Sequence, residues 1–277
     1  MARNKKPRTE LEVLRDDLDE MRKDGLFDNP SPSFMQKMQS RISLVLKNTF
    51  KKLWNKESRW FTSSFRGNYL DYKKSLQIRN VGIKGYKLED LNPIFANLYK
   101  TRLQSSLDLI KTQNQENLLK LKRRFLDWTT QAEFRNKEDL KEATKLPSNK
   151  RTRFILRDQS NKMSASLDNI VAEKYGAICF EWKTRNDNRV TGKPGGLYPK
   201  INDDSPNHGD HWSRRGKFYY YSNLPQEVKD KLNLKNFAGS DKSLKDGVPG
   251  VPYGCRCWGK NYYDIDDLPE ELVKQNV

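Results

Sequence analysis

Apolar residues recur at spacings of three and four over most of the first 144 positions, and this period constrains the fold more than any other feature of the sequence. A Thr-x-x-Glu capping box at Thr9 and Glu12 predicts that the first helix begins there. Its apolar face would hold Leu11, Leu14, Leu18 and Met21. The period resumes from 33 to about 60 and from 88 to about 144, with breaks rich in Gly and Pro at 25–32 and a turn at 80–86. The sequence therefore predicts a succession of long amphipathic helices.

The composition argues against a single thick core. Only 35% of the 277 residues are hydrophobic and 32% are charged, so much of the chain must face water or a polar partner. No stretch reaches the roughly 18 to 20 apolar residues of a membrane span. The three cysteines do not form a disulfide framework and no apolar leader precedes the first polar residues, so we expect a reducing compartment.

Positive charge is concentrated in the amino-terminal half. The formal net charge is +17, and the first 150 residues hold 32 cationic against 19 acidic side chains. Residues 34–80 contain eleven Lys or Arg and only two acidic residues, Glu57 and Asp71. Such a field favours polyanions, so these helices are expected to contact nucleic acid or an acidic protein surface. The candidate contact residues are Lys47, Lys51, Lys52, Lys56, Arg59, Arg66, Lys73, Lys74 and Arg79.

Aromatic residues are interleaved with these cations, and their role has two interpretations. Between Trp54 and Tyr72 six aromatic side chains could stack on exposed bases, as they do in single-strand binders. Helical spacing explains many of them equally well as residues of a buried face, and we favour that interpretation.

The pattern of the sequence changes after Pro147, from long helical periods to short elements. A helix is predicted from Arg151 to Lys174, ended by Gly176, and a half-buried strand from Ile178 to Lys183. Further short elements are expected at 216–221 (strand), 225–234 (helix) and 255–263 (strand), separated by loops rich in Gly and Pro. We therefore predict an α+β protein with an elongated, mainly helical amino-terminal region. Its parts would be a flexible basic arm at 1–8, a basic helical region at 9–146, and an α+β domain at 147–277 with an acidic tail helix from about Leu268.

Four short blocks between about 151 and 263 resemble the Mu F-like head-morphogenesis family of tailed phages. The first is an Arg-Asp-Gln helix start, and the second is a strand followed by an Asp-x-Arg-Val turn. The third is a His followed by Gly-Lys, and the fourth is a closing Cys-Arg-Cys. The residues that carry the resemblance are Arg157, Asp158, Asp187, Arg189, His211, Gly216, Lys217, Cys255, Arg256 and Cys257. This chain departs from the family pattern between Val190 and His211, where an insertion rich in Gly and Pro replaces a short link.

The resemblance implies a minor capsid protein that acts in head morphogenesis near the portal vertex rather than an enzyme. Its partners would then be the portal protein, the major capsid protein, or both, together with packaged double-stranded DNA. Its location would be the phage head, and the host cytoplasm during assembly.

His208, His211, Cys255 and Cys257 are side chains of the types that bind zinc, and four of them would make a closed structural site. One structural zinc is therefore a candidate cofactor. The alternative is that both cysteines lie on one face of a strand as small buried apolar groups, with His211 bonded to the covering loop. Arg256 would then point to the opposite face and be free to meet a partner.

Two other functions remain open at this stage. His211 with Arg189, Arg214, Arg215 and Lys217 could support a histidine-dependent or metal-assisted nuclease delivered with the DNA. A free nucleic-acid-binding protein would satisfy the charge equally well. The chain contains no phosphate-binding loop, Gly-x-Ser-x-Gly elbow or His-Glu-x-x-His motif.

Overall fold

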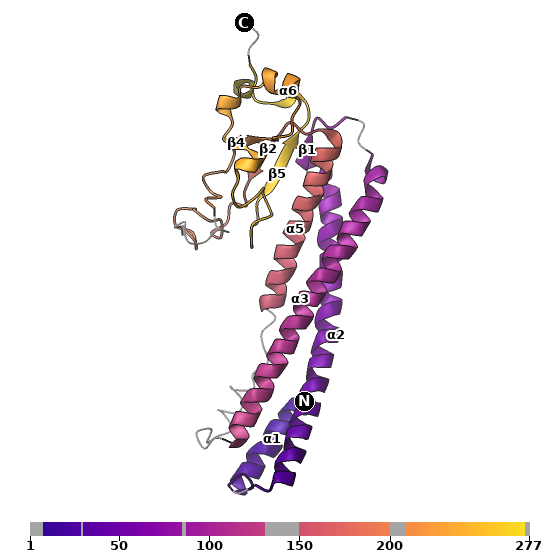
Figure 1. Ribbon diagram of the computed structural model, residues 1–277, viewed down its shortest axis with the longest axis vertical. Coiled ribbons are helices and arrows are strands. Elements are labelled where there is room, and N and C mark those ends of the chain that lie inside the picture. The colour runs from indigo at the N-terminus through magenta and orange to yellow at the C-terminus, as the bar shows by residue number, and fades with distance from the viewer. Residues whose placement is uncertain (1–7, 29, 85–86, 131–149, 200–208, 275–277) are drawn as a thin grey trace, which may run out of the picture. The chain divides into compact units, whose positions relative to one another are not determined.

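The computed structural model describes residues 8–28, 30–84, 87–130, 150–199 and 209–274 (Figure 1). All but the last residue of the predicted basic arm, and the end of the predicted helix at 131–144, lie outside this part of the chain. The protein is α+β, as predicted: long helices come first and a small five-stranded sheet follows. No described helix is long and apolar enough to cross a membrane.

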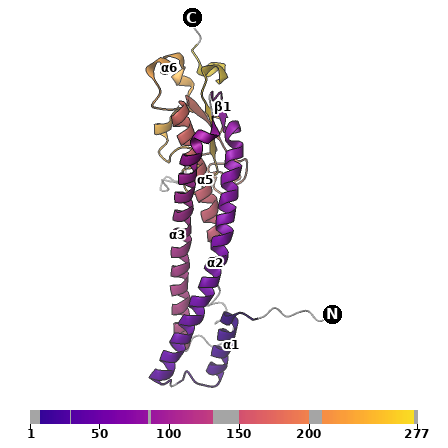
Figure 2. The same cartoon turned by 90° about the vertical axis from the view of Figure 1, so that its right-hand side faces the viewer.

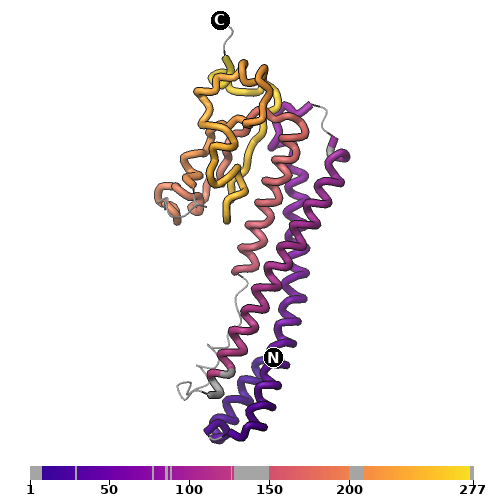
Figure 3. The backbone as a smooth tube through the Cα atoms, in the orientation of Figure 1, coloured from indigo at the N-terminus to yellow at the C-terminus, as the bar shows by residue number. Residues whose placement is uncertain are grey.

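The tube in Figure 3 traces the chain through its helices and strands in sequence order. The long helices are α1 (Glu10–Lys23), α2 (Pro32–Arg79), α3 (Leu88–Thr130) and α5 (Lys150–Tyr175). The strands are β1 (Asn80–Val81), β2 (Cys179–Lys183), β3 (Phe218–Tyr220), β4 (Gly239–Ser240) and β5 (Trp258–Tyr262), with the short helix α6 (Gln226–Lys231) after β3.

The chain divides into two compact units, and the division does not follow sequence order. One unit comprises Met1–Thr62 and Leu107–Thr152, and the other comprises Ser63–Ser106 and Arg153–Val277. Because α2 and α3 each contribute to both units, the helical region predicted for 9–146 is shared between them.

The first unit is held together by the apolar face that the periodicity predicts. Leu11, Leu14 and Leu18 of α1 are buried against the start of α2 and the end of α3, through residues such as Ile42 and Phe125. Figure 2 shows α1 lying beside the beginning of α2. The predicted capping box is present, with the Thr9 hydroxyl accepting from the backbone of Glu12 and the Glu12 carboxylate accepting from the backbone of Thr9. This arrangement satisfies donors that would otherwise be unpaired at the helix start.

In the second unit a buried ionic network joins the end of α2 to α5. The Asp168 carboxylate accepts a hydrogen bond from the Tyr72 hydroxyl at 2.8 Å and pairs with the Arg79 guanidinium at 2.9 Å. The same guanidinium lies over the rings of Tyr72 and Trp258. Arg79 therefore has a structural role here, because three neighbours already hold its charged group.

The sheet has the order β1-β5-β2-β3-β4. The central strand β2 runs antiparallel to both β5 and β3, whereas β1 and β4 pair in parallel at the two edges. Phe180 and Trp182 of β2 lie in one buried cluster, and Cys179 lies in another. The sequence predicted a half-buried strand here, but Cys179 is fully buried as well, because apolar segments cover both faces of β2.

Two further predictions about this unit were wrong. The strand predicted at 255–263 begins only at Trp258, because polar groups of α5 bind the backbone at Gly254 and Cys255 and hold that segment outside the ladder. The acidic tail forms two single 3-10 turns, Ile265–Asp267 and Glu270–Leu272, instead of an α-helix. It runs alongside the segment after α6, where Leu232 and Val273 form an antiparallel bridge.

Candidate metal centre

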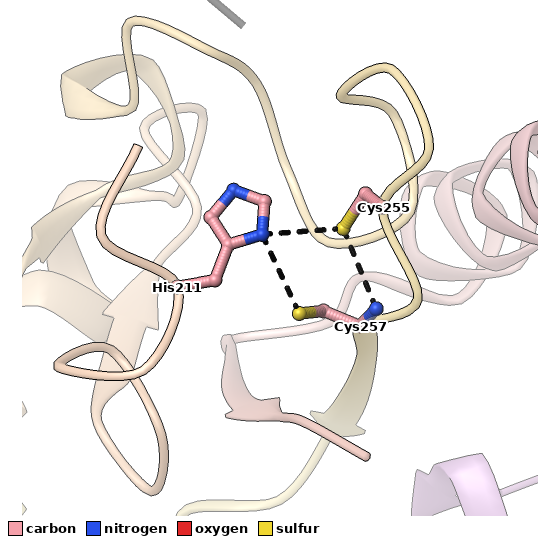
Figure 4. A group of neighbouring side chains, drawn as sticks. All are labelled: His211, Cys255 and Cys257. Carbon is pink, nitrogen blue, oxygen red and sulfur yellow. Dashed lines mark hydrogen bonds between the residues drawn. The ribbon is translucent and has the colours of Figure 1, made fainter. Parts of the chain in front are cut away.

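His211, Cys255 and Cys257 form one buried cluster beside the sheet. The His211 Nδ1 atom lies 3.5 Å from the Cys255 Sγ atom and 3.7 Å from the Cys257 Sγ atom. Figure 4 marks both contacts with dashed lines. The three potential ligand atoms all lie within 4.8 Å of one another. Each of the three residues is at most 6% exposed. The structure thus brings together three of the four side chains that the sequence nominated. The fourth, His208, lies outside the described residues.

Local backbone contacts place the two cysteines. The Asp158 Oδ1 atom on α5 accepts a hydrogen bond from the Gly254 N–H at 2.7 Å, and the Asn161 side chain donates to the Cys255 carbonyl at 2.5 Å. Gly254 has a φ of +67°, a conformation that other residues adopt only with strain. Helix α5 and this glycine together turn the chain so that both thiols reach the imidazole before β5 begins. The period-two geometry proposed for the cysteines is therefore not the reason that they lie together.

A second set of contacts places the imidazole. His211 opens a run of turns that returns to the sheet at Gly216, whose N–H donates to the Trp182 carbonyl at 2.9 Å. Gly216 has a φ of +75°, which this reversal of the chain requires. The Trp182 ring packs against the imidazole, with 5.2 Å between ring centroids.

Asp246 supports the imidazole from the side opposite the thiols. Its carboxylate lies 2.9 Å from the His211 Nε2 atom and also accepts from the Arg214 guanidinium at 2.7 Å. Arg214 in turn lies over the Trp182 ring at 4.9 Å. Because Nε2 is bonded to a carboxylate, Nδ1 is the nitrogen left to face the sulfur atoms. A carboxylate behind a histidine in this way is the usual support of a metal-ligating imidazole.

The cluster shifts the pKa values of its members in opposite directions. Burial alone would lower the pKa of His211, but the hydrogen bond to Asp246 and the contact with Cys255 raise it to about 9. Burial alone would raise the pKa of Asp246, but its bonds to His211 and Arg214 lower it to about 2. Contact with Cys257 and with the imidazole holds the pKa of Cys255 well below its usual value. Cys255 and burial together raise the pKa of the Cys257 thiol.

The atomic spacing fits a tetrahedral metal. With bonds of about 2.3 Å to sulfur and about 2.0 to 2.1 Å to nitrogen, a tetrahedral zinc separates its sulfur and nitrogen ligands by about 3.6 Å. The two observed separations are 3.5 and 3.7 Å. Thiolate and imidazole are also the donors that such an ion prefers. The spacing of His211 from Cys255 and Cys257 is therefore compatible with a bound metal ion.

The remaining residues of the four sequence blocks gather around the same place. Arg256 pairs with Asp187, whose other oxygen accepts from the Arg189 N–H at 3.0 Å. Asp158 also pairs with Lys162, at 3.0 Å. Arg256 is thus engaged within the domain rather than left free for a partner. Lys217 is exposed, and its backbone helps to hold the turn before β3.

The cations proposed to meet nucleic acid fall into two groups. Arg79 is enclosed as described, Lys52 pairs with Glu10, Lys73 bonds Asn92, and Lys74 lies 3.9 Å from Asp71. Five others are exposed on α2 and have no ion-pair partner among the described residues: Lys47, Lys51, Lys56, Arg59 and Arg66. Among the interleaved aromatics, Phe61, Phe65 and Tyr72 are buried, as packing along a helix predicts.

Asp246 is the site residue that the sequence did not indicate. It follows His211 by 35 positions in a turn-rich segment, and no spacing or motif marks it.

The chain was compared with protein-family models, with curated proteins and with solved structures, and it matches none of them.

Proposed function

We propose that this chain is a minor structural protein of a tailed-phage head, acting near the portal vertex, with a carboxy-terminal domain stabilised by one zinc ion. The observation that best supports this role is the convergence of the four sequence blocks. Asp158 binds the backbone at Gly254, Asp187 pairs with Arg256, and His211 meets both cysteines. Residues that carry a family resemblance are expected to gather in this way when they maintain a common domain core.

The exposed cations of α2 support a contact with polyanions in the same role. Lys47, Lys51 and Arg59 lie toward one side of α2, at i, i+4 and i+12, and Lys56 lies further round the helix; Glu57 is the only acid among the residues that they span. Such a face neutralises phosphate groups without reading sequence, which suits contact with packaged double-stranded DNA. The acidic surface of a portal or capsid protein is the other partner that this charge would fit.

A structural role suits the metal better than a catalytic one. His211 is 4% exposed, and both nitrogens of its ring are engaged, Nε2 by Asp246 and Nδ1 by the thiols. A general base must have a nitrogen within reach of substrate, so this geometry disfavours the histidine-dependent nuclease. Arg214, which such an enzyme would use against phosphate, is held by Asp246 and Trp182.

Zinc content tests the metal proposal. The purified protein should hold about one zinc per chain, and His211→Ala should lose it because one of the ligands is removed. Asp246→Asn should weaken zinc binding by about 10- to 100-fold while the ligands remain, and the exposed Asp230→Asn change should have no effect. Competition with a chromophoric chelator measures each affinity, and His208→Ala shows whether that residue is the fourth ligand. A zinc-to-protein ratio near zero for the wild type would leave the cysteines as packing residues.

Phage genetics tests the role in the head. A nonsense mutation in this gene should yield heads that are malformed or lack DNA, while tail assembly continues. Supplying the wild-type chain in trans should restore infectious particles, and the Cys255→Ser, Cys257→Ser double variant should restore fewer because its domain is destabilised. Normal heads and normal yield without the chain would contradict the proposal.

A further inference from the structure

A cavity of about 420 Å³ opens at the proposed metal centre, within the carboxy-terminal part of the second unit, and His211, Cys255 and Cys257 are among its lining residues. Its volume lies in the range of small-molecule binding sites. Aromatic and aliphatic side chains form part of its wall, with Leu197, Tyr198 and Tyr253 all more than 40% exposed. Tyr253 packs against Phe154 with 4.9 Å between ring centroids. Apolar rings that stay exposed around a cavity are a surface on which a ligand ring can lie.

The same cavity is strongly cationic. Arg157, Arg189 and Arg256 line it, and no acidic side chain does so among the described residues. Arg256 is paired with Asp187, but neither Arg157 nor Arg189 has a carboxylate partner in the described part of the chain. The Arg157 Nε atom is buried and lacks a hydrogen-bond partner there.

Guanidinium groups gathered without carboxylates are suited to phosphate, which their planar fork binds through two parallel hydrogen bonds. An exposed aromatic wall beside them is suited to the flat face of a base. We propose that this cavity binds a nucleotide, with its phosphate on Arg157 and Arg189 and its base against the wall that contains Tyr253. The inference does not depend on the role in the phage head, and Arg157, Arg189 and Tyr253 are not among the proposed metal ligands.

The nucleotide could be free or part of a single strand, and binding assays distinguish the two. Calorimetric titrations of the zinc-loaded protein would use adenosine monophosphate, adenosine and inorganic phosphate, and fluorescence anisotropy would use a labelled 15-residue oligothymidylate. We expect saturable binding of the monophosphate, or of the oligonucleotide alone if the site serves a strand. Adenosine and phosphate should each bind at least roughly tenfold more weakly than the nucleotide species, because each lacks one of the two contacts.

Variants assign the binding to this cavity. Arg157→Gln and Arg189→Gln should each weaken nucleotide binding by about tenfold, as expected for loss of a charge-assisted bond. Lys235→Gln removes one positive charge from an exposed position outside the cavity and should leave binding within about twofold. Tyr253→Ala should weaken nucleotide binding and leave phosphate binding unchanged. Thermal melting shows whether each variant is folded. If Arg157→Gln destabilises the domain, Arg157→Lys replaces it in the assay, because it keeps the positive charge but loses the planar fork.

Several results would overturn the proposal. They are the absence of saturable nucleotide binding, equal binding of phosphate and nucleotide, equal loss in Lys235→Gln and the arginine variants, and preferential capture of an acidic peptide such as hexaglutamate. Repeating the titration after chelation separates arginine contacts from a phosphate bound by the metal. Loss of binding only on chelation, with no effect of the arginine variants, would also contradict it.

Discussion

Burial raises the pKa of two carboxylates in the second unit, but their net pKa shifts are opposite. Asp246 receives hydrogen bonds from both His211 and Arg214, and its pKa falls to about 2 in spite of burial. Asp168 is bonded by Tyr72 and Arg79, yet burial dominates and raises its pKa to about 6. Asp246 therefore keeps its charge under mildly acidic conditions, whereas Asp168 takes up a proton there.

The elevated pKa of Asp168 predicts a pH-dependent stability. Between about pH 4 and pH 6 the carboxyl ionises in the unfolded chain but stays protonated in the folded one, so the free energy of unfolding should fall as the pH rises. A shift from 3.8 to about 6 corresponds to a loss on the order of 3 kcal/mol over that window. The Asp168→Asn variant cannot ionise and should lack this step.

Urea denaturation of both proteins at several pH values measures the effect, because other carboxyl groups cancel in the difference between them. The stability of the wild type relative to Asp168→Asn should decrease from pH 4 to pH 6. A relative stability that increases over this window would mean that the ion pair with Arg79 outweighs the burial of the carboxylate.

The site was predictable where chemistry alone marks a residue. His211, Cys255 and Cys257 were nominated because imidazole and thiolate are zinc donors, and the structure brings them together. Asp246 could not be nominated, because an aspartate in a turn-rich segment resembles any surface acid until the fold places it behind the imidazole. The position of the two cysteines could not be explained from the sequence either, since it depends on a contact between α5 and a glycine almost one hundred positions away.

Among the elements, the long helices were predictable because their period is local. The capping box at Thr9 and the leucine face of α1 needed no knowledge of the rest of the chain. Strand β1 has only two residues, and it exists because Asn80 and Val81 pair with β5 about 180 positions later. The tail was mistaken for an α-helix for the same reason, since its backbone bonds close only single 3-10 turns and otherwise join it to Lys231 and Asn233, at and just after the end of α6.

The exposed cations of α2 predict how DNA binding should depend on salt concentration. Replacing Lys47, Lys51 and Arg59 with Gln should lower the slope of log Kd against log salt by roughly 2 to 3 for a 20-base-pair duplex, because each phosphate contact contributes about 0.9. The matched control replaces three exposed lysines of the carboxy-terminal domain: Lys217, Lys231 and Lys235. Fluorescence anisotropy at four salt concentrations measures both. An equal slope for the α2 variant and the wild type would remove DNA as the partner of this face and leave the acidic protein.

For the whole chain, the cations of the helical part and the His-Cys-Cys cluster of the carboxy-terminal part suit separate tasks. The exposed cations of α2 suit a large polyanionic surface, and the proposed metal centre around His211 would hold together a domain whose loops are long relative to its strands. A protein that is built into a particle needs a contact surface and a stable domain, and turnover is not required of it. This division of tasks is what a minor head protein would need.

Quantitative mass spectrometry of nuclease-treated phage particles, purified by density-gradient centrifugation, tests this role directly. Peptides of this chain should be found in the finished particle at a small fraction of the copy number of the major capsid protein, and they should remain with the head when tails are removed. Their absence from purified particles, with the chain present only in the lysate, would contradict the role in the head.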